Sequence, residues 1–341
     1  MLKEDKISDS EMYEHHLFEV EKNHDLIRID KFLLLRLSNT TRTKIQKSIS
    51  AGNVFCNDLP VKSNYKVKPN DKISIRFSYE PYNKEIIPEN IPLDVVFEDN
   101  EIVVINKPSN MVVHPSYGHY TGTLVHAILY RFKDIKANSE TQRPGLVHRL
   151  DKNTTGLIVI ARTEHALTFL SEQFVSRTIK RTYVALVWGD VKDDKGTITG
   201  NIGRNKKNRK IMTVFNDSSE GKHAVTHYEV LERFRYVTLV KCYLETGRTH
   251  QIRVHMKHIG HPLFNDNEYG GDKILRGTTF SKYKQFVQNC FKILPRQALH
   301  AISLSLKHPK SGEIVSFNTD LPLDLKNIIN RWRQYVTNHL Q

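Results

Sequence analysis

The sequence predicts an α+β protein made of two domains. Segments with the pattern of strands outnumber helical ones and do not alternate with them regularly, which favours a mixed sheet over repeated βαβ units. A polar segment containing Pro81, Pro88 and Pro92 separates a short region from a much longer one, as an extended linker does. The 341 residues suit two domains of ordinary size. We expect a polar tail at 1–24, a small domain at 25–78, a linker at 79–92 and a large domain at 93–341.

The charge balance points to a polyanionic partner. The chain carries 51 Lys and Arg against 37 Asp and Glu, a net charge of +14, and a basic surface attracts nucleic acid through its potential and through counterion release. Nucleic acid or a ribosomal particle is therefore the expected partner. No segment approaches the roughly 18 apolar residues of a membrane span, and the first residues are charged, unlike a signal peptide. We expect a cytoplasmic protein without membrane contact, and a monomer by default.

In the small domain, apolar residues between 28 and 37 have helical spacing. Residues 38–41 offer N-cap side chains for a second helix, which carries Ile45 and Ile49 and ends at Gly52. Short strands are expected at 54–56 and 72–77. The second helix carries basic side chains that we expect to contact RNA phosphates, although a solvated helix face is the alternative: Arg42, Lys44 and Lys47.

The large domain begins with two expected strands, at 93–98 and 102–105, joined by a tight turn. A loop at 109–122 and a helix at 123–132 follow. The remaining expected elements are strands at 157–161, 180–187, 223–231, 237–244, 299–306 and 314–317, and helices that begin near Thr163, at about 252 and at Pro322.

Asp151 lies in the most distinctive stretch of the chain. It stands between Arg149 and Lys152 and is followed by Gly156 and then the apolar run at 157–161, which is typical of a buried strand. A loop that ends in a buried strand is held rigidly, so Asp151 can be aimed at a substrate. An aspartate is ionised at neutral pH and needs no base to act as a nucleophile. The alternative is an Asp in a turn, paired with its basic neighbours.

Arg253 is the candidate partner of that aspartate. The spacing of Ile252, Met256 and Ile259 predicts a helix that places Arg253 near its first turn, next to a loop. An arginine supplies a permanent charge and a two-pronged fork, which would keep a partly buried Asp151 ionised and oriented.

A strongly basic segment is expected between two strands of the large domain. Five of the seven residues at 204–210 are Lys or Arg, and a basic loop on an RNA-binding protein can clamp the backbone of the RNA; the alternative is a solvated hairpin tip. The candidate RNA contacts here are Arg204, Lys206, Lys207, Arg209 and Lys210.

Metal, nucleotide and disulfide chemistry have little support. The three cysteines are far apart and lack Cys-x-x-Cys spacing, so we interpret them as core residues in a reducing compartment: Cys56, Cys242 and Cys290. Four clustered histidines lack the spacing of a zinc site: His250, His255, His258 and His261. No phosphate-binding loop, dinucleotide fingerprint or Gly-x-Ser-x-Gly elbow is present. We expect no metal and no cofactor.

Two family resemblances can be stated from these motifs. Ile29-Asp30-Lys31-Phe32-Leu33, Gly52-Asn53-Val54 and Val67-Lys68-Pro69-Asn70-Asp71 resemble the small alpha-L-type RNA-binding domain, which is shared with a small-subunit ribosomal protein. The segment at 148–157 closely resembles the active-site motif of the RluA family of pseudouridine synthases, with Asn153 and Thr155 as mild departures. The match continues in order through about residue 320, in segments at 106–108, 113–115, 181–185, 246–253, 260–262, 269–270 and 297–301.

The second resemblance implies an isomerase with a mixed, mainly antiparallel central sheet flanked by helices. It implies that Asp151 attacks a flipped-out uridine, so that uracil detaches from the ribose and rejoins through carbon 5. By the same resemblance, Tyr183 stacks on the target base and is a candidate for moving a ribose proton, Arg253 pairs with Asp151, and Arg149 enters the RNA where the base has left. The chemistry needs no cofactor.

The resemblance also implies an RNA substrate, most often large-subunit ribosomal RNA in members with this N-terminal domain, either free or in a pre-ribosomal particle. A non-catalytic RNA-binding or ribosome-assembly factor is the alternative, and it predicts the replacement of Asp151, Tyr183 or Arg253, all of which are present. A hydrolase with an Asp nucleophile is a weaker alternative, because no partner that would activate water is visible.

Overall fold

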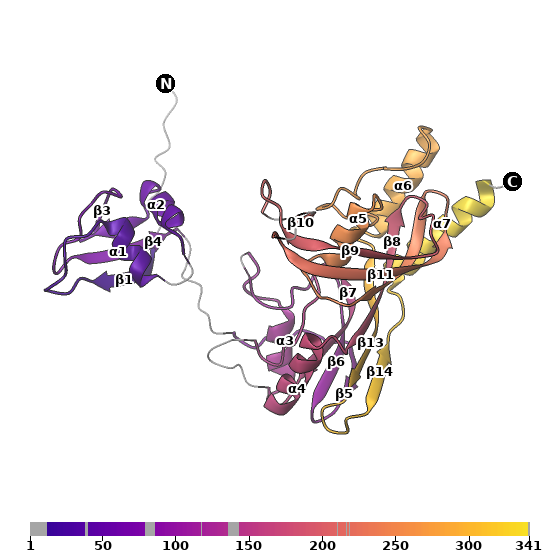
Figure 1. The fold of residues 1–341 in the computed structure, drawn as a ribbon, viewed down its shortest axis with the longest axis horizontal. Coiled ribbons are helices and arrows are strands. Elements are labelled where there is room, and N and C mark those ends of the chain that lie inside the picture. The colour runs from indigo at the N-terminus through magenta and orange to yellow at the C-terminus, as the bar shows by residue number, and fades with distance from the viewer. Residues whose placement is uncertain are drawn as a thin grey trace. The chain divides into compact units, whose positions relative to one another are not determined.

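The computed structural model describes residues 12–37, 40–78, 86–116, 118–135, 143–209, 211–215, 217 and 219–339. The chain divides into two compact units, residues 1–84 and 85–341 (Figure 1). This division falls inside the segment at 79–92 that we expected to be a linker. Within the described ranges, no helix is both long enough and apolar enough to cross a membrane.

The first unit is a small antiparallel sheet with two helices. The sheet has the order β1-β4-β2-β3, and the helices α1 and α2 supply Phe32, Leu33 and Ile45 to a core that they share with Val54 and Ile73 of the sheet. The elements are β1 (Tyr13–Glu19), α1 (Ile29–Arg36), α2 (Arg42–Ser50), β2 (Val54–Cys56), β3 (Leu59–Pro60) and β4 (Lys72–Phe77). Thr41, one of the predicted cap residues, caps α2, because its hydroxyl accepts the Lys44 N–H at 3.4 Å.

The expected polar tail at 1–24 is wrong for residues 13–19, which form β1. This strand pairs antiparallel with β4, and a β-bulge between Glu14 and His16 interrupts its register. The bulge breaks the alternation of buried and exposed side chains, and none of the seven side chains is fully buried. Backbone pairing with β4 therefore defines this strand, and its side-chain pattern gave no signal.

Asp30 ties the two helices of the first unit together. Its fully buried carboxylate accepts hydrogen bonds from Arg28 (3.1 Å), Arg42 (3.0 Å) and Gln46 (2.9 Å). Burial alone would raise the pKa of Asp30, but the hydrogen bonds from Gln46, Arg28 and Arg42 outweigh it and lower the pKa to about 2. Arg42, predicted as an RNA contact, thus also holds α2 to α1.

We predict that Asp30→Asn destabilises the first unit and makes its free energy of unfolding less dependent on pH in the acid range. A carboxylate whose pKa falls from 3.8 to about 2 on folding stabilises the fold by about 2 kcal/mol above pH 4, and this contribution is lost as the pH falls through 2. Amide hydrogen exchange in β2 and β4 between pH 5 and pH 2 measures it. The pKa of Asp71 is also lowered, so the variant should keep a shallower dependence. Identical pH profiles for variant and wild type would contradict the prediction.

The second unit is built on one large mixed sheet. Its order is β10-β9-β11-β12-β8-β13-β7-β6-β5, with β14 paired to β13, and only β13 and β7 run parallel among the described strands. The strands are β5 (Val95–Glu98), β6 (Ile102–Lys107), β7 (Thr155–Ala161), β8 (Lys180–Trp188), β9 (Lys195–Arg204), β10 (Met212–Phe215), β11 (Lys222–Arg233), β12 (Val237–Leu244), β13 (Leu299–Lys307) and β14 (Ile314–Asn318).

Helices cover both faces of this sheet (Figure 1). The helices are α3 (Leu124–Arg131), α4 (Glu164–Val175), α5 (Gln251–His258), α6 (Ser281–Ile293) and α7 (Leu323–His339). On one face, α3 and α5 pack on a core that includes Tyr183 and Ala185 of β8. On the other face, α6 and α7 pack on Val184 and Leu186 of the same strand, while α4 packs on β7. Because both faces are covered, the central strands are apolar throughout and not only at alternate positions.

Most elements of the second unit occur where the sequence predicted them. The Thr163 hydroxyl caps α4 by accepting the Ala166 N–H at 3.0 Å, and the expected turn at 99–100 joins β5 to β6. Helix α6 was not predicted from the sequence. Its polar face is large, and only Tyr283, Val287 and Cys290 are buried against the core.

Candidate active site

One row of directly paired residues crosses the large sheet beneath the site. It runs from Lys107 on β6 to Gly156 on β7, Ala301 on β13, Tyr183 on β8 and Cys242 on β12. Directly opposed residues in a sheet point to the same face. Lys107 and Tyr183, 76 positions apart in the chain, therefore point to the same face of the sheet, with β7 and β13 between them. Asp151 precedes β7.

Gly156 allows β7 and β13 to pair closely within this row. Its φ is +111°, and a side-chain carbon at this position would collide with the carbonyl oxygen of Ala301 on the parallel neighbour. Glycine alone combines this backbone conformation with so close an approach. Gly156, five residues after Asp151, is thus needed for the contact between β7 and β13.

Two buried cations hold the Asp151 loop, by which we mean residues 149–154. From one side, the Lys107 ammonium donates hydrogen bonds to the carbonyl oxygens of Pro108 (2.7 Å), Met111 (2.9 Å) and Lys152 (3.1 Å). Burial lowers the pKa of Lys107 to about 7, although the charge of Asp151 opposes this shift. Lys107 therefore fixes the loop through its backbone and adds positive charge near Asp151.

The second cation, Arg296, approaches the Asp151 loop from the segment before β13. It donates to the carbonyl oxygen of Asn153 at 3.2 Å and is itself held by both carboxylate oxygens of Asp324, at 2.7 and 2.9 Å. Next to it, the Gln297 amide donates to the Thr154 hydroxyl at 3.2 Å. The loop that carries Asp151 is therefore held at successive residues by distant parts of the chain.

Arg253 lies among three carboxylates. Its guanidinium binds both oxygens of the fully buried Asp266, at 2.7 and 2.8 Å, reaches Glu268 at 2.5 Å and contacts Asp151 at 3.3 Å. Burial opposes its charge, but the hydrogen bonds to Asp266 outweigh this effect and raise the pKa of Arg253 above its ordinary value. The predicted pair of Asp151 and Arg253 is therefore present, across 102 residues of sequence.

His250 stands on the other side of Asp151. It precedes α5 in the left-handed conformation, with φ +56°, and its Nε2 lies 3.8 Å from an Asp151 oxygen. Burial lowers the pKa of His250, although the charge of Asp151 opposes this shift. The Tyr269 hydroxyl accepts the Met212 N–H and lies 2.8 Å from His250 Nδ1. A neutral His250 that accepts the Tyr269 hydrogen therefore directs its Nε2–H toward Asp151.

These groups line a cavity of about 510 Å³. Asp151, Tyr183 and Arg253 all face it, together with the exposed Arg149. Tyr183 is 7% exposed, and burial raises the pKa of its hydroxyl. The hydroxyl is therefore protonated at neutral pH, and the ring offers a flat apolar surface inside the cavity.

Three of the four histidines considered for a metal site have separate protein partners. His250 contacts Tyr269, His255 lies 2.9 Å from the Thr226 hydroxyl and His261 lies 2.8 Å from the Trp188 carbonyl oxygen. In the part of the chain that the structure describes, no group of three or more His, Cys, Asp or Glu side chains is arranged to hold a metal ion. All three cysteines are free and buried, as predicted.

The predicted RNA contacts are exposed and spread over both units. Arg42, Lys44 and Lys47 are exposed on α2, and Arg204, Lys206, Lys207 and Arg209 are exposed on the hairpin between β9 and β10. In that hairpin, Arg204 donates to the Arg209 carbonyl oxygen and Lys206 pairs with Glu220 at 2.7 Å. The remaining predicted contact, Lys210, lies outside the described residues.

Several supports of the site were not predicted from the sequence. Asp266 and Arg296 carry no signal of their own, because an isolated polar residue is most often exposed. Lys107 and the 297–301 segment belong to motifs that the sequence analysis quoted, yet their contacts with the Asp151 loop become visible only when distant strands are paired.

We predict that Asp266→Asn destabilises the second unit far more than Glu268→Gln. Both acids bind Arg253, but Asp266 is fully buried whereas the Glu268 side chain is 42% exposed. Loss of the buried anion should cost about 3 kcal/mol, and loss of the half-exposed one less than about 1 kcal/mol. Urea unfolding followed by the fluorescence of Trp188 and Trp332, both in this unit, measures the two losses. Equal losses would show that burial does not set the strength of these pairs.

Comparison with known proteins identifies the family. The model for RNA pseudouridylate synthase matches residues 101–258, and the model for the S4 domain matches residues 27–73. An RNA pseudouridine synthase of Chlorobaculum parvum is 45% identical over 94% of this chain and 98% of its own length. Ribosomal large subunit pseudouridine synthase D of Neisseria meningitidis is 41% identical over 89% and 78% of the two chains. A solved structure, human RNA pseudouridylate synthase domain containing 1, has a similar fold, with a TM-score of 0.52 and 24% identity over 73% of this chain and 96% of that one.

The fold and these matches define an RNA-modifying isomerase. The chain belongs to the RluA family of RNA pseudouridine synthases, in the form that carries an S4 RNA-binding domain. The predicted family, α+β fold class and isomerase class are confirmed, and RNA is the substrate class. The non-catalytic alternative has no support from the comparisons.

Proposed function

We propose that this enzyme converts specific uridines of large-subunit ribosomal RNA to pseudouridine, with Asp151 as the nucleophile and the target uridine flipped out of the RNA. The reaction breaks the bond between N1 of uracil and C1′ of ribose and forms a bond from C5 to C1′, with loss of the C5 proton and gain of a proton at N1. The observation that carries the proposal is the position of Asp151, which faces a cavity and is in contact with the buried Arg253.

The geometry around Asp151 suits a carboxylate that acts as a nucleophile or a base. Arg253 contacts only one Asp151 oxygen, at 3.3 Å, because Asp266 occupies the fork of its guanidinium. Asp151 is therefore oriented without being fully neutralised, and its side chain remains 18% exposed to the cavity. A carboxylate in this state can attack C1′ of the ribose or take a proton from C2′ on the way to a glycal, since both routes begin from the same contact with the sugar.

Tyr183 and Arg149 complete the proposed site. The buried ring of Tyr183 gives the uracil a surface to stack on, and its protonated hydroxyl can donate a hydrogen bond or a proton to the sugar. Arg149 is exposed at the cavity, where its long side chain can occupy the space that the extruded base leaves in the RNA. Extrusion is the general solution when the reacting atoms lie inside a stacked helix.

The choice of ribosomal RNA rests on the relatives and on charge. The printed name of the Neisseria meningitidis relative specifies the large ribosomal subunit. The S4 domain of this chain and the basic hairpin between β9 and β10 offer exposed cations for the phosphates of structured RNA. Work on ribosomal RNA would place the enzyme where ribosomes assemble, the cytoplasm of a bacterium. We expect a monomer, to be measured by light scattering.

We predict that Asp151→Asn lowers pseudouridine formation by about 10³-fold or more, because the amide keeps the shape but loses the nucleophile. Ribosomal RNA from a strain lacking this gene is incubated with purified protein, and pseudouridines are then located chemically. Asp320→Asn, at an exposed carboxylate, is the matched control and should keep full activity.

Retained activity in Asp151→Asn would overturn the assignment of the nucleophile. Pseudouridine formed in transfer RNA or small-subunit RNA, but not in large-subunit RNA, would overturn the proposed substrate and leave the isomerase class intact.

We predict that Tyr183→Phe keeps RNA affinity within about threefold and lowers the single-turnover rate by about 10²-fold, since the ring remains and the proton donor is lost. Filter binding and single-turnover kinetics measure the two quantities. Tyr228→Phe is the control, because Tyr228 pairs with Cys242 in the same cross-strand row but does not line the cavity. An unchanged rate in Tyr183→Phe would remove the hydroxyl from the mechanism.

A further inference from the structure

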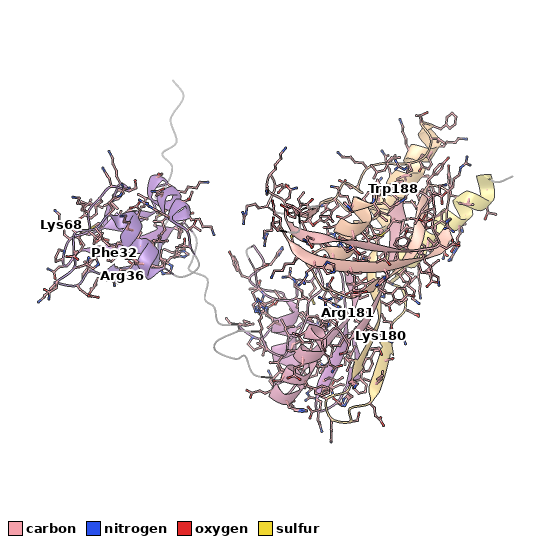
Figure 2. All side chains as sticks on the ribbon, viewed as in Figure 1. Phe32, Arg36, Lys68, Lys180, Arg181 and Trp188 are labelled. Carbon is pink, nitrogen blue, oxygen red and sulfur yellow. The ribbon has the colours of Figure 1, made fainter. Side chains whose placement is uncertain are left out.

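Arg181 is a buried cation that has no hydrogen-bond or ion-pair partner among the described side chains. It lies near the start of β8, at the other end of the strand from Trp188, and is only 9% exposed (Figure 2). Its Nε has no hydrogen-bond partner, and no carboxylate among the described residues forms an ion pair with its guanidinium. The other two buried arginines of the described chain, Arg253 and Arg296, each bind both oxygens of an aspartate. Burying a charge without a partner is costly.

The guanidinium of Arg181 is nevertheless held in place. It lies over the ring of Phe174, 5.4 Å from the ring centroid, and a side-chain carbon on residue 247 would lie 2.8 Å from its Nη1. Gly247, in the turn before α5, thus leaves room for this group. Phe174 and Gly247 line the same cavity as Asp151 and Tyr183. A stacked cation keeps its in-plane N–H donors free for a ligand.

Nothing nearby in the described cavity wall competes for those donors. The cavity has two acidic side chains, of which Asp151 contacts Arg253 and Glu245 lies 2.6 Å from His227. His148 also stacks on the ring of Phe174. It accepts the Val159 N–H through Nε2 at 3.0 Å and is therefore neutral. The guanidinium is oriented and uncompensated inside the site where we propose that RNA reacts.

We infer that Arg181 binds a backbone phosphate adjacent to the target uridine. This inference rests on the proposed function. A phosphodiester is the anionic group that RNA brings into such a cavity, and its two free oxygens match the fork of a guanidinium. A uracil carbonyl is a neutral acceptor, so it would satisfy a hydrogen bond without compensating the buried charge. Arg181 would thus hold the sugar-phosphate of the flipped nucleotide while Asp151 reaches the ribose.

If Arg181 binds a phosphate, its charge should contribute to activity and not to the stability of the free protein. A structural arginine stabilises the free protein, whereas a buried cation that awaits a ligand does not. Arg181→Met keeps an unbranched side chain against Phe174 and removes the charge. We expect this variant to unfold at a temperature equal to or above that of the wild type, and to lose about 10-fold to 100-fold in kcat/KM. A clear loss of thermal stability with unchanged kcat/KM would overturn the inference.

The direct test changes the phosphate as well as the protein. A short RNA containing the target uridine is made with a neutral methylphosphonate linkage, one position at a time, on either side of that uridine. In the wild-type enzyme, one of these linkages should lower kcat/KM by about 10-fold to 100-fold; in Arg181→Met the same linkage should cost less than about threefold, because the contact is already missing. A methylphosphonate several nucleotides away should affect both enzymes equally.

Two further comparisons make the result decisive. Lys180→Met, at the exposed neighbouring position, should leave the cost of the flanking methylphosphonate as large as in the wild type. Equal costs of the flanking methylphosphonate in the wild type and in Arg181→Met would overturn the inference. It would also be overturned if removal of a uracil oxygen, and not of the phosphate charge, lowered kcat/KM in the wild type but not in Arg181→Met. If the wild-type enzyme forms no pseudouridine in any RNA, the proposed function fails and the inference fails with it; activity without coupling refutes the inference alone.

Discussion

The buried charge of Arg253 is the constraint on which the site depends. A guanidinium that is 3% exposed must be compensated where it stands, and Asp266, also fully buried, does this through both of its oxygens. Because Asp266 neutralises most of that charge, Asp151 receives an orienting contact and keeps much of its own negative charge. The electrostatics thus distinguish a structural acid, Asp266, from the acid that we propose to react, Asp151, although both bind the same arginine.

Asp151 also owes its position to backbone contacts. Lys107 and Arg296 donate to carbonyl oxygens at Lys152 and Asn153, so the Asp151 loop is fixed by groups that do not touch the Asp151 carboxylate. Such an arrangement leaves the carboxylate free on the cavity side. Catalytic groups need to be placed within about half an ångström, and supports from rigid strands achieve this better than a free loop does.

Local patterns allowed much of the fold to be predicted, while the contacts of the site could not be. The helix α2, with its Thr41 cap, and the apolar strand β7 have signals within about ten residues, and both were predicted. The strand β1 was missed because its bulge removes the alternation on which strand prediction relies. Arg253 was a candidate partner of Asp151 on chemical grounds and the family resemblance implied the pair, but no local pattern reports a contact across 102 residues.

The row of paired residues from Lys107 to Cys242 has a consequence for how this enzyme can vary. Side chains in the row are brought together by hydrogen-bond register, so substitutions elsewhere leave the geometry intact, whereas one inserted or deleted residue in β7, β8 or β13 would turn a site residue to the opposite face. The hairpin between β9 and β10 lies at the edge of the sheet, beyond this row. A change in the length of that hairpin would leave the row intact, so the exposed basic edge of the sheet can vary while the geometry around Asp151 stays constant.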